Sequence, residues 1–391
     1  MIAMEQETIP QGWHIKRFGD LVSISTGKKD ANAQVVGGKY PFFTCAQGVS
    51  EIDNYAFDTE AVIVAGNGDF NVKYYKGKFD AYQRTYVIET KNDLIPIFLY
   101  YGTQYALPRI TSGARGSTIQ YLKIGDFTEF QFLVPPIQEQ KKITEILSAV
   151  DTEIEKVENI IFQSKRLKEG LMRDLFTKGI GHKNFKKTEI GAVPEEWKIS
   201  KLSEIATVER GKFSHRPRNA PEFYGGNIPF IQTGDVVNSN GKISSYTQTL
   251  NEKGLSVSRL FKKGTIVITI AANIGDTGIL QFDSCFPDSL IGITPSEIID
   301  PIYLEYYLRT QKEYLNSIST QSAQKNINLE KLNPLLIKVP PKNEQKKIAD
   351  ILSSTDEKIS VNTKYKETLI KLKKGLMQDL LSGKVRVKPN K

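Results

Sequence analysis

The sequence predicts an α+β protein with an internal repeat, in which two similar α/β domains are separated by two long helices. Three observations favour this architecture. Segment 134–180 recurs as segment 339–387. Both copies have the length and apolar spacing of a long helix. Short β-rich runs, bounded by turn-forming residues, fill the regions that precede them.

The two repeated segments align without a gap, at the constant shift in numbering that takes Pro135 to Pro340, which we call the repeat offset. Each copy begins with Pro-Pro, which a first helical turn tolerates but a strand cannot continue, and then proceeds without proline to the end of the segment. We therefore predict one long helix in each copy. The matched pairs include Pro135/Pro340, Glu139/Glu344, Gln140/Gln345, Ile143/Ile348, Leu147/Leu352, Asp151/Asp356, Gly170/Gly375, Leu171/Leu376 and Leu175/Leu380.

Apolar residues along the first predicted helix alternate in steps of four and three, the spacing of a coiled-coil seam. They are Ile143, Leu147, Val150, Ile154, Val157 and Ile161, and Leu171 and Leu175 resume the pattern. The seam of the second copy is more polar, with Thr355, Asn362, Lys366 and Lys373. Periodicity alone fits two helices on separate cores equally well. Their matching lengths favour mutual packing, as a spacer of roughly 60 Å.

The duplication extends beyond the helices. Ile9–Trp13 recurs as Val193–Trp197 at a smaller shift in numbering, whereas Pro96–Leu99 recurs as Pro301–Leu304 at the repeat offset itself. The second half therefore carries about 21 additional residues in its middle, where loops tolerate insertions and recognition usually lies. We predict a first domain over 1–135, a helix over 136–180, a linker and second domain over 181–340, and a second helix with a tail over 341–391.

Within each half, β-rich runs dominate the middle and proline marks the start of a shorter helix. The predicted shorter helices are Pro96–Tyr105 and Pro301–Ser317. The predicted strands are Ala61–Ala65, Tyr86–Thr90, Phe130–Val134, Ile228–Gln232, Thr265–Ile270, Leu290–Thr294 and Leu335–Val339.

Composition favours a polyanionic partner. The chain has 53 Lys and Arg against 44 Asp and Glu, a formal net charge of +9. Such an excess favours nucleic acid, although it also promotes solubility. Cys45 and Cys285 form no metal-binding pair with the three histidines, so we expect a reducing compartment and no zinc. The N-terminus lacks an apolar core and no stretch is long enough to span a bilayer, so we expect a soluble, cytoplasmic protein without a membrane partner.

Motifs for catalysis are missing. The Pro-Pro pairs follow Val134 and Val339, whereas an adenine methyltransferase needs Asn or Asp before Pro-Pro to hold the adenine amino group. No phosphate-binding G-x-x-x-x-G-K-[ST] loop is present. Pro287-Asp288 has a downstream acidic residue, Glu297, but Ile298-Ile299 follow it without the lysine that a nuclease metal site uses. We therefore expect no catalytic or metal-binding residues in this chain.

Candidate DNA-binding residues are distributed over Gly-rich or polar loops of both halves. Arg, Lys, Asn and Gln are the side chains that bind phosphates and read base edges. A single such residue is usually an ordinary solvated one, but the set favours contact with DNA. The candidates are Lys28, Lys29, Lys73, Gln83, Arg84 and Arg115 in the first half, and Lys212, His215, Arg216, Arg218, Asn219, Arg259 and Asn273 in the second.

Taken together, the sequence resembles the specificity (S) subunit of type I restriction-modification systems. The resemblance covers essentially the whole chain and rests on the order of its motifs. They are P-P-x-x-E-Q-K-K-I at 135–143 and 340–348, G-L-M-x-D-L at 170–175 and 375–380, T-E-I-G-A-V-P-E-E-W at 188–197, and S-A-Q-K-N-I at 322–327. The first half departs from the pattern at 117–122, which lacks Gln-Lys-Asn.

The resemblance implies that each half is a target recognition domain for one part of a split double-stranded DNA sequence. It also implies that the helices pack as an antiparallel coiled coil that sets the spacer. Two adenine-N6 methyltransferase (M) subunits would dock on this scaffold, joined by restriction and translocation (R) subunits. Those partners would use S-adenosylmethionine, ATP and Mg, whereas this chain would bind no cofactor. Two other classes stay open: a protein–protein scaffold, and a self-contained DNA modification enzyme fused to it.

Overall fold

The computed structural model describes residues 9–91, 94–271, 273–319 and 326–387. The chain divides into two compact units. The first runs to Ile160 and resumes at Asn362, and the second extends from Ile161 to Val361. Each unit contains one α/β domain and a part of each long helix, α4 (Ile137–Leu175) and α11 (Lys342–Leu381).

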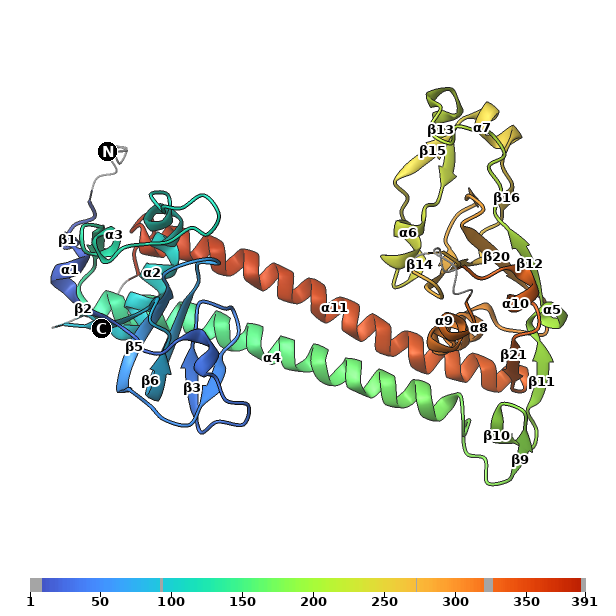
Figure 1. Cartoon of the computed structure of the whole chain (residues 1–391), viewed down its shortest axis with the longest axis horizontal. Coiled ribbons are helices and arrows are strands. Elements are labelled where there is room, and N and C mark those ends of the chain that lie inside the picture. The colour runs from blue at the N-terminus through green and yellow to red at the C-terminus, as the bar shows by residue number, and fades with distance from the viewer. Residues whose placement is uncertain (1–8, 92–93, 272, 320–325, 388–391) are drawn as a thin grey trace. The chain divides into compact units, whose positions relative to one another are not determined.

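The first unit is built on a six-stranded sheet in the order β2-β7-β5-β6-β3-β4. Its neighbouring strands are antiparallel except for the parallel pair β3 and β6. Helix α2 lies against the sheet (Figure 1). The bounds are β2 (Val22–Thr26), β3 (Tyr40–Phe43), β4 (Ser50–Ile52), β5 (Phe57–Ala65), β6 (Val72–Ala81), β7 (Thr85–Thr90) and α2 (Pro96–Thr111).

Alternation along the central strand β5 explains why both faces of this sheet are covered. Val62 and Val64 point to the core that contains Phe98 and Leu99 of α2, while Ile63 joins a second cluster with Phe43, Phe79 and Val87 on the other face. A second, two-stranded sheet pairs β1 (His14–Arg17) with β8 (Gln131–Val134), and β8 leads into α4. The short helices of this unit are α1 (Phe18–Leu21) and α3 (Ile124–Thr128), with a 3₁₀ turn at Ala31–Ala33.

The second unit repeats the scheme but divides the corresponding strands between two sheets. Its main sheet has the order β12-β20-β17-β18-β14, and a further sheet has the order β15-β13-β19-β16. The strands are β12 (Ala206–Arg210), β13 (Tyr224–Phe230), β14 (Gly241–Ile243), β15 (Gln248–Leu250), β16 (Leu260–Phe261), β17 (Ile266–Thr269), β18 (Thr277–Leu280), β19 (Ser284–Cys285) and β20 (Leu290–Pro295). In the further sheet Phe230 pairs with Gln248 and Cys285, as Phe42 pairs with Ser50 and Asp80 in the first unit.

The second unit also contains two short strand pairs and several helices. Strand β11 pairs with β21, which leads into α11 as β8 leads into α4, and β9 pairs with β10. The remaining bounds are β9 (Phe185–Thr188), β10 (Gly191–Pro194), β11 (Lys198–Lys201), β21 (Leu336–Val339), α5 (Leu202–Ile205), a 3₁₀ turn at Pro221–Phe223, α6 (Thr233–Val237), α7 (Glu252–Ser256), α8 (Pro301–Thr310), α9 (Lys312–Ile318) and α10 (Leu329–Leu332).

The predicted α+β fold with an internal repeat is confirmed, with two differences in the shorter helices. Helix α2 continues through Pro108 and ends at Thr111, because one missing amide donor does not stop a helix packed on a sheet. The predicted helix Pro301–Ser317 is divided at Gln311 into α8 and α9. There the Thr310 hydroxyl donates to the carbonyl of Tyr307 and competes with the helix's own hydrogen bonds.

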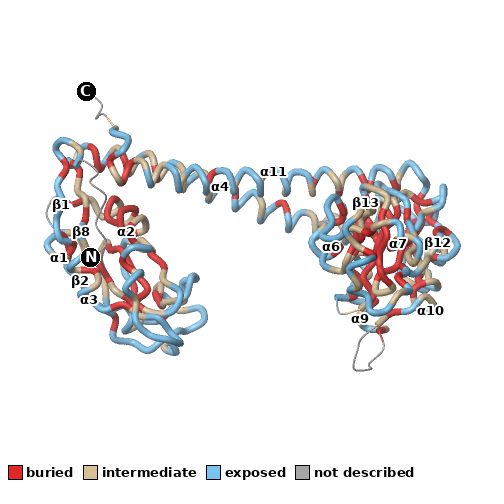
Figure 2. The backbone as a smooth tube through the Cα atoms, turned by 90° about the horizontal axis from the view of Figure 1, so that it is seen from above, coloured by how far each residue is buried: buried red, intermediate tan, exposed pale blue. Residues whose placement is uncertain are grey.

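The two long helices run antiparallel within each unit. In the first unit Lys373 and Lys366 of α11 pair with Asp151 and Glu158 of α4, at 2.7 and 2.8 Å. The numbering rises along one helix as it falls along the other. All predicted seam positions of α4 are buried or half-buried, and buried positions recur along the helices (Figure 2). The polar seam positions Lys366 and Lys373 thus carry ion pairs between the helices.

Each long helix has, in its first turn, a glutamate that fastens it to its own unit. The Trp13 indole nitrogen donates to Glu139 at 2.9 Å, and Arg386, which follows α11, donates to both of its oxygens at 2.7 and 2.9 Å. In the second unit Trp197 donates to Glu344 at 3.0 Å, and His182, which follows α4, lies 2.9 Å from it. The motif P-P-x-x-E-Q therefore positions each domain on its helix.

Candidate nucleic-acid interface

Four of the predicted residues of the first unit lie together around one turn. Gly27 packs against the backbone of Ala81 and Tyr82, where an added Cβ would meet the Ala81 carbonyl at 1.6 Å. The next residues of this loop, Lys28 and Lys29, are therefore held beside the turn between β6 and β7. That turn carries Gln83, whose backbone amide donates to the Lys29 carbonyl at 2.9 Å, and Arg84.

The charges of this cluster are available for a ligand. Lys28, Lys29, Gln83 and Arg84 are all exposed. None of their side chains has an ion pair or hydrogen bond with another residue in the described part of the chain. Gln83 and Arg84 also line a cavity of about 250 Å³ with Gly66, Tyr86 and Leu122. The exposed cations suit the phosphates of a nucleic acid, and the amide at the mouth of the cavity suits a base edge.

Lys73 and Arg115, also predicted, have protein partners of their own. The Lys73 ammonium donates to the Ala46 carbonyl at 2.7 Å and to the Asn71 side chain, and burial lowers its pKa although the nearby Asp69 carboxylate opposes this. Arg115 donates to Asp126 at 2.6 Å. Hydrogen bonding to Arg115 lowers the Asp126 pKa, although burial opposes this. Both cations stabilise loops that flank the cluster.

In the second unit the predicted basic loop is fastened to an acidic residue. Arg218 and Arg216 both pair with Asp288, the latter at 3.5 Å. Arg216 also donates to the carbonyls of Phe213 and His215, at 2.6 and 2.8 Å. Because the side chains of Arg216 and Arg218 remain 53% and 44% exposed, their free edges still face solvent. Asp288, an unsupported candidate for nuclease chemistry, thus holds a loop in place.

The other predicted residues of this unit divide into two groups. Lys212, Asn219 and the half-buried His215 lie on the same loop, where the His215 ring packs 4.2 Å from that of Phe223. Arg259 is close to this loop but pairs with Glu209 at 2.9 Å. Asn273 lies in the connection between β17 and β18, and among the described residues no hydrogen bond joins it to the loop.

The turns at the centre of the two surfaces are equivalent. In the first unit the amide of Thr85 donates to the Tyr82 carbonyl at 2.8 Å, and at the repeat offset the amide of Leu290 donates to the Pro287 carbonyl at 3.1 Å. Gly211 packs on Phe286 and Pro287 as Gly27 packs on Ala81 and Tyr82. The repeat thus places a glycine–lysine loop beside the same turn in both units.

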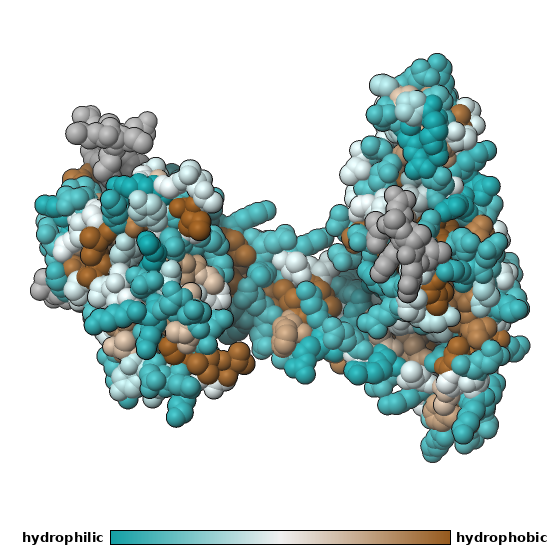
Figure 3. Space-filling view, in the orientation of Figure 1, coloured by the Kyte–Doolittle hydropathy of each residue, from teal (hydrophilic) through white to brown (hydrophobic). Residues whose placement is uncertain are grey.

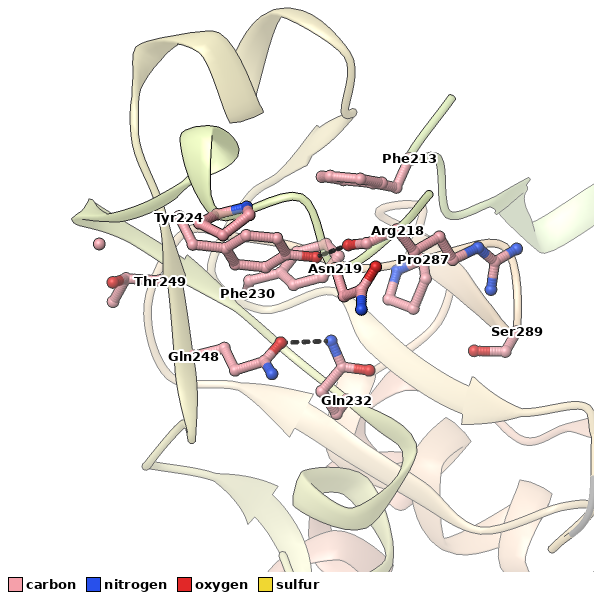
Figure 4. Close-up of a pocket in the computed structure, with 12 residues that line it drawn as sticks. Phe213, Arg218, Asn219, Tyr224, Phe230, Gln232, Gln248, Thr249, Pro287 and Ser289 are labelled. Carbon is pink, nitrogen blue, oxygen red and sulfur yellow. Dashed lines mark hydrogen bonds between the residues drawn. The ribbon is translucent and has the colours of Figure 1, made fainter. Parts of the chain in front are cut away.

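A larger cavity, of about 650 Å³, opens beside this turn in the second unit (Figure 4). Its walls are aromatic: the Phe213 ring lies 5.8 Å from Tyr224 and 5.4 Å from Phe230. Two amides meet across it, where Gln232 Nε2 donates to Gln248 Oε1 at 3.0 Å. Arg218, Asn219, Pro287 and Ser289 also line it. The lobe that carries β13 and β15 is predominantly hydrophilic on the face in Figure 3.

Sequence reasoning missed Gln232, Gln248 and Ser289. Gln232 follows β13 and Gln248 begins β15, and the counterpart of this strand pair in the first unit is β3 with β4. One available signal was the repeat offset. Applied to Gln83 and Arg84, it leads to Asp288 and Ser289.

Three further features bear on the chemistry of this chain. No group of three or more His, Cys, Asp or Glu side chains in the described ranges could hold a metal ion. None of the described helices combines the length and apolar composition needed to cross a membrane. Burial raises the pKa of the Cys285 thiol to about 11, so this cysteine stays protonated in its core position.

The sequence profile of the type I restriction modification DNA specificity domain matches residues 10–161 and 194–371, one match in each half of the repeat. The chain belongs to this specificity family. It is similar over 376 residues, with 31% identity, to the type I restriction enzyme EcoDI specificity subunit of Escherichia coli, covering 88% of this chain and 81% of that protein. It is 29% identical to the MjaVIII specificity subunit of Methanocaldococcus jannaschii, covering 97% and 94%.

Solved structures place this member of the specificity family in the same fold. A crystal structure of the type I restriction-modification S subunit from M. genitalium superposes with a TM-score of 0.67 at 18% identity, covering 96% of this chain and 97% of that one. Of the predicted S-A-Q-K-N-I motif, residues 322–325 lie outside the described residues. Asn326 forms a β-bridge with Ala271, as Tyr121 does with Asn67 in the first unit.

Proposed function

We propose that this chain is the DNA-recognition subunit of a type I restriction-modification complex, in which each unit reads one part of a bipartite double-stranded target. The observation that carries the proposal is the duplicated surface. The same turn, packed against the same glycine–lysine loop, is built in both units and is given different side chains: Gln83 and Arg84 in the first, Asp288 and Ser289 in the second. A repeated surface with varied side chains suits two different half-sites.

Catalysis belongs to partner subunits. Two methyltransferase subunits that use S-adenosylmethionine dock on the repeated helices, and restriction–translocation subunits that use ATP and Mg join them. The repeat supports the stoichiometry, because Glu139 with Trp13 and Glu344 with Trp197 build matching helix–domain junctions. The long helices set the number of base pairs between the half-sites.

The test is to assemble the full chain with its methyltransferase partner and map the methylated adenines in genomic DNA. We expect a split motif, and exchange of the first α/β domain for that of another family member should change one part of it only. A motif that stays unchanged on exchange would contradict the assignment of one half-site to each unit.

The same preparation distinguishes the alternatives. Methyl transfer by the rigorously purified chain alone would favour a fused enzyme, and assembly without any sequence preference on DNA would favour a protein–protein scaffold. Complex mass reports the partner stoichiometry, for which we expect two methyltransferase subunits per chain.

A further inference from the structure

We propose that the cavity of the second unit is a base-reading pocket, in which Gln232 and Gln248 recognise the major-groove edge of an adenine in the half-site of that unit. This inference rests on the proposed DNA-recognition function and assigns one of its determinants to named side chains.

The amide pair has the chemistry that an adenine edge requires. Adenine presents an N7 acceptor and an N6 donor in the major groove, which one glutamine can engage by donating and accepting at once. The hydrogen bond from Gln232 Nε2 to Gln248 Oε1 orients both side chains, and leaves the Gln248 amino group free to donate in the described part of the structure. Asn219 adds a third amide to the same pocket.

The walls hold these amides in position. Phe213, Tyr224 and Phe230 pack against one another, and Gln232 follows closely on the buried end of β13. The Tyr224 hydroxyl donates to the Arg218 carbonyl and so fixes the basic loop beside the pocket. A rigid frame lowers the entropy lost when a side chain is ordered on DNA, so the pocket is suited to discrimination.

The charged residues of the loop have a different task. Asp288 pairs with Arg216 and Arg218, whose side chains remain partly exposed. Their exposed edges suit phosphates, which position a protein on DNA without carrying sequence information. The uncharged amides are therefore the groups that recognise the base edge.

The first unit provides an independent observation for this location. Its cavity of about 250 Å³ is lined by Gln83 and Arg84, and Ser289, the counterpart of Arg84 at the repeat offset, lines the pocket of the second unit. The linings of the two hollows thus share one position of the repeat. Their donors differ, amides in one and an arginine with an amide in the other, as expected for surfaces that read different bases.

The experiment uses the full chain assembled with its methyltransferase partner and maps methylated motifs by sequencing. For the double variant Gln232→Ala/Gln248→Ala we expect discrimination at one adenine position of one half-site to fall roughly 5- to 150-fold, the range for loss of a bidentate base contact. The other half-site should be unchanged. The matched amide control is Gln311→Ala, which removes a glutamine between α8 and α9 of the same unit. It should leave the motif intact.

A second variant tests the assignment by a change of base preference rather than by a loss of discrimination. Gln248→Glu replaces a donor by an acceptor, so the preference at that position should shift from adenine towards cytosine, whose N4 amino group donates. Thermal unfolding of each variant confirms that the second unit is folded.

Each other outcome contradicts the proposal in its own way. A uniform loss of methylation over all sequences would assign these glutamines to the DNA backbone, and an unchanged motif at an unchanged rate would remove the pocket from the interface. Both results would leave DNA recognition by the chain standing. Absence of any split motif with the unmodified chain would instead refute the proposed function.

Discussion

Lys168 Nζ of α4 lies 2.6 Å from Asp356 Oδ1 of α11. The contact recurs at the repeat offset with the helices exchanged, where Lys373 Nζ lies 2.7 Å from Asp151 Oδ1. A tyrosine completes each site: Tyr306 donates to Asp356 at 2.6 Å and Tyr101 to Asp151 at 2.8 Å. Burial and the nearby carboxylate raise the pKa of both phenols, so they remain donors. The repeat thus builds the same helix–helix contact in each unit.

Removal of one carboxylate should destabilise its own unit. Because the Lys168 side chain is only 16% exposed, Asp356→Asn leaves a largely buried ammonium without its anion, and we expect a loss of about 1.5–3 kcal/mol. Asp151→Asn should act alike in the first unit. The chain has two tryptophans, one per unit, so the fluorescence of Trp197 in a Trp13→Phe background follows denaturation of the second unit.

The matched control for this prediction is Glu158→Gln, which breaks the Lys366–Glu158 pair between the same helices. Its side chains are 33% and 49% exposed, so the loss should stay below about 1 kcal/mol. Equal losses for Glu158→Gln and Asp151→Asn would show that burial of the pair is irrelevant.

A second prediction concerns acid stability of the first unit. Burial alone would raise the pKa of Glu139, but hydrogen bonds from Arg386 and Trp13 outweigh it, so the pKa lies below its usual value of 4.5. An acid with a depressed pKa in the folded state contributes stability above its unfolded pKa and loses it as pH falls through the folded value. The contribution should therefore be complete at pH 7 and fade below about pH 4.5.

Arg386→Ala removes the hydrogen-bonding partner that lowers the Glu139 pKa more. We expect the midpoint of thermal unfolding, followed through Trp13, to fall by roughly 2–4 °C at pH 7 and by less at pH 4. The transition followed through Trp197 should not move, because Arg386 belongs to the first unit. A deficit that is the same at both pH values would mean that Glu139 is not the group responsible.

Much of the scaffold could be predicted because its signals are local. Pro-Pro followed by a coiled-coil seam located α4 and α11, and short β-rich runs located most of the central strands. The repeat offset also predicted the equivalence of Glu139 with Glu344, although not that each would accept from a tryptophan 126 or 147 residues earlier in the chain. Such partners are brought together by the tertiary fold.

The candidate site was less predictable for the same reason. Basic residues in loops were found from composition, but Asp288 lies 70 residues after Arg218, and only the packing of the loop on the β19–β20 turn brings them together. Gln232 and Gln248 carry no distinguishing sequence pattern. What sets them apart is the aromatic frame of Phe213, Tyr224 and Phe230, which only the tertiary fold assembles.

A third prediction compares salt dependence for the two units. Neutralising Lys28, Lys29 and Arg84 together should reduce the slope of log affinity against log salt by about 2–3, since each phosphate contact contributes about 0.9. Neutralising Arg216 and Arg218 should reduce it by less, because both already share Asp288. Titration of the assembled complex with DNA at several salt concentrations measures both. Lys178→Gln, whose cation pairs with Asp174, serves as the control.

The last prediction uses the glycine on which the first recognition surface is built. An added Cβ at Gly27 would overlap the Ala81 carbonyl at 1.6 Å, so Gly27→Ala must push the Lys28–Lys29 loop away from the turn that carries Gln83 and Arg84. Binding should weaken about tenfold or more, an effect of about 1.4 kcal/mol or above, and mapped motifs should lose definition in one half-site only. Gly48→Ala, where nothing lies within 4 Å, is the matched control in the same unit. The corresponding variant of the second unit, Gly211→Ala, should instead reduce the definition of the other half-site. Wild-type binding and an intact motif in a folded Gly27→Ala variant would show that this contact does not position the recognition surface.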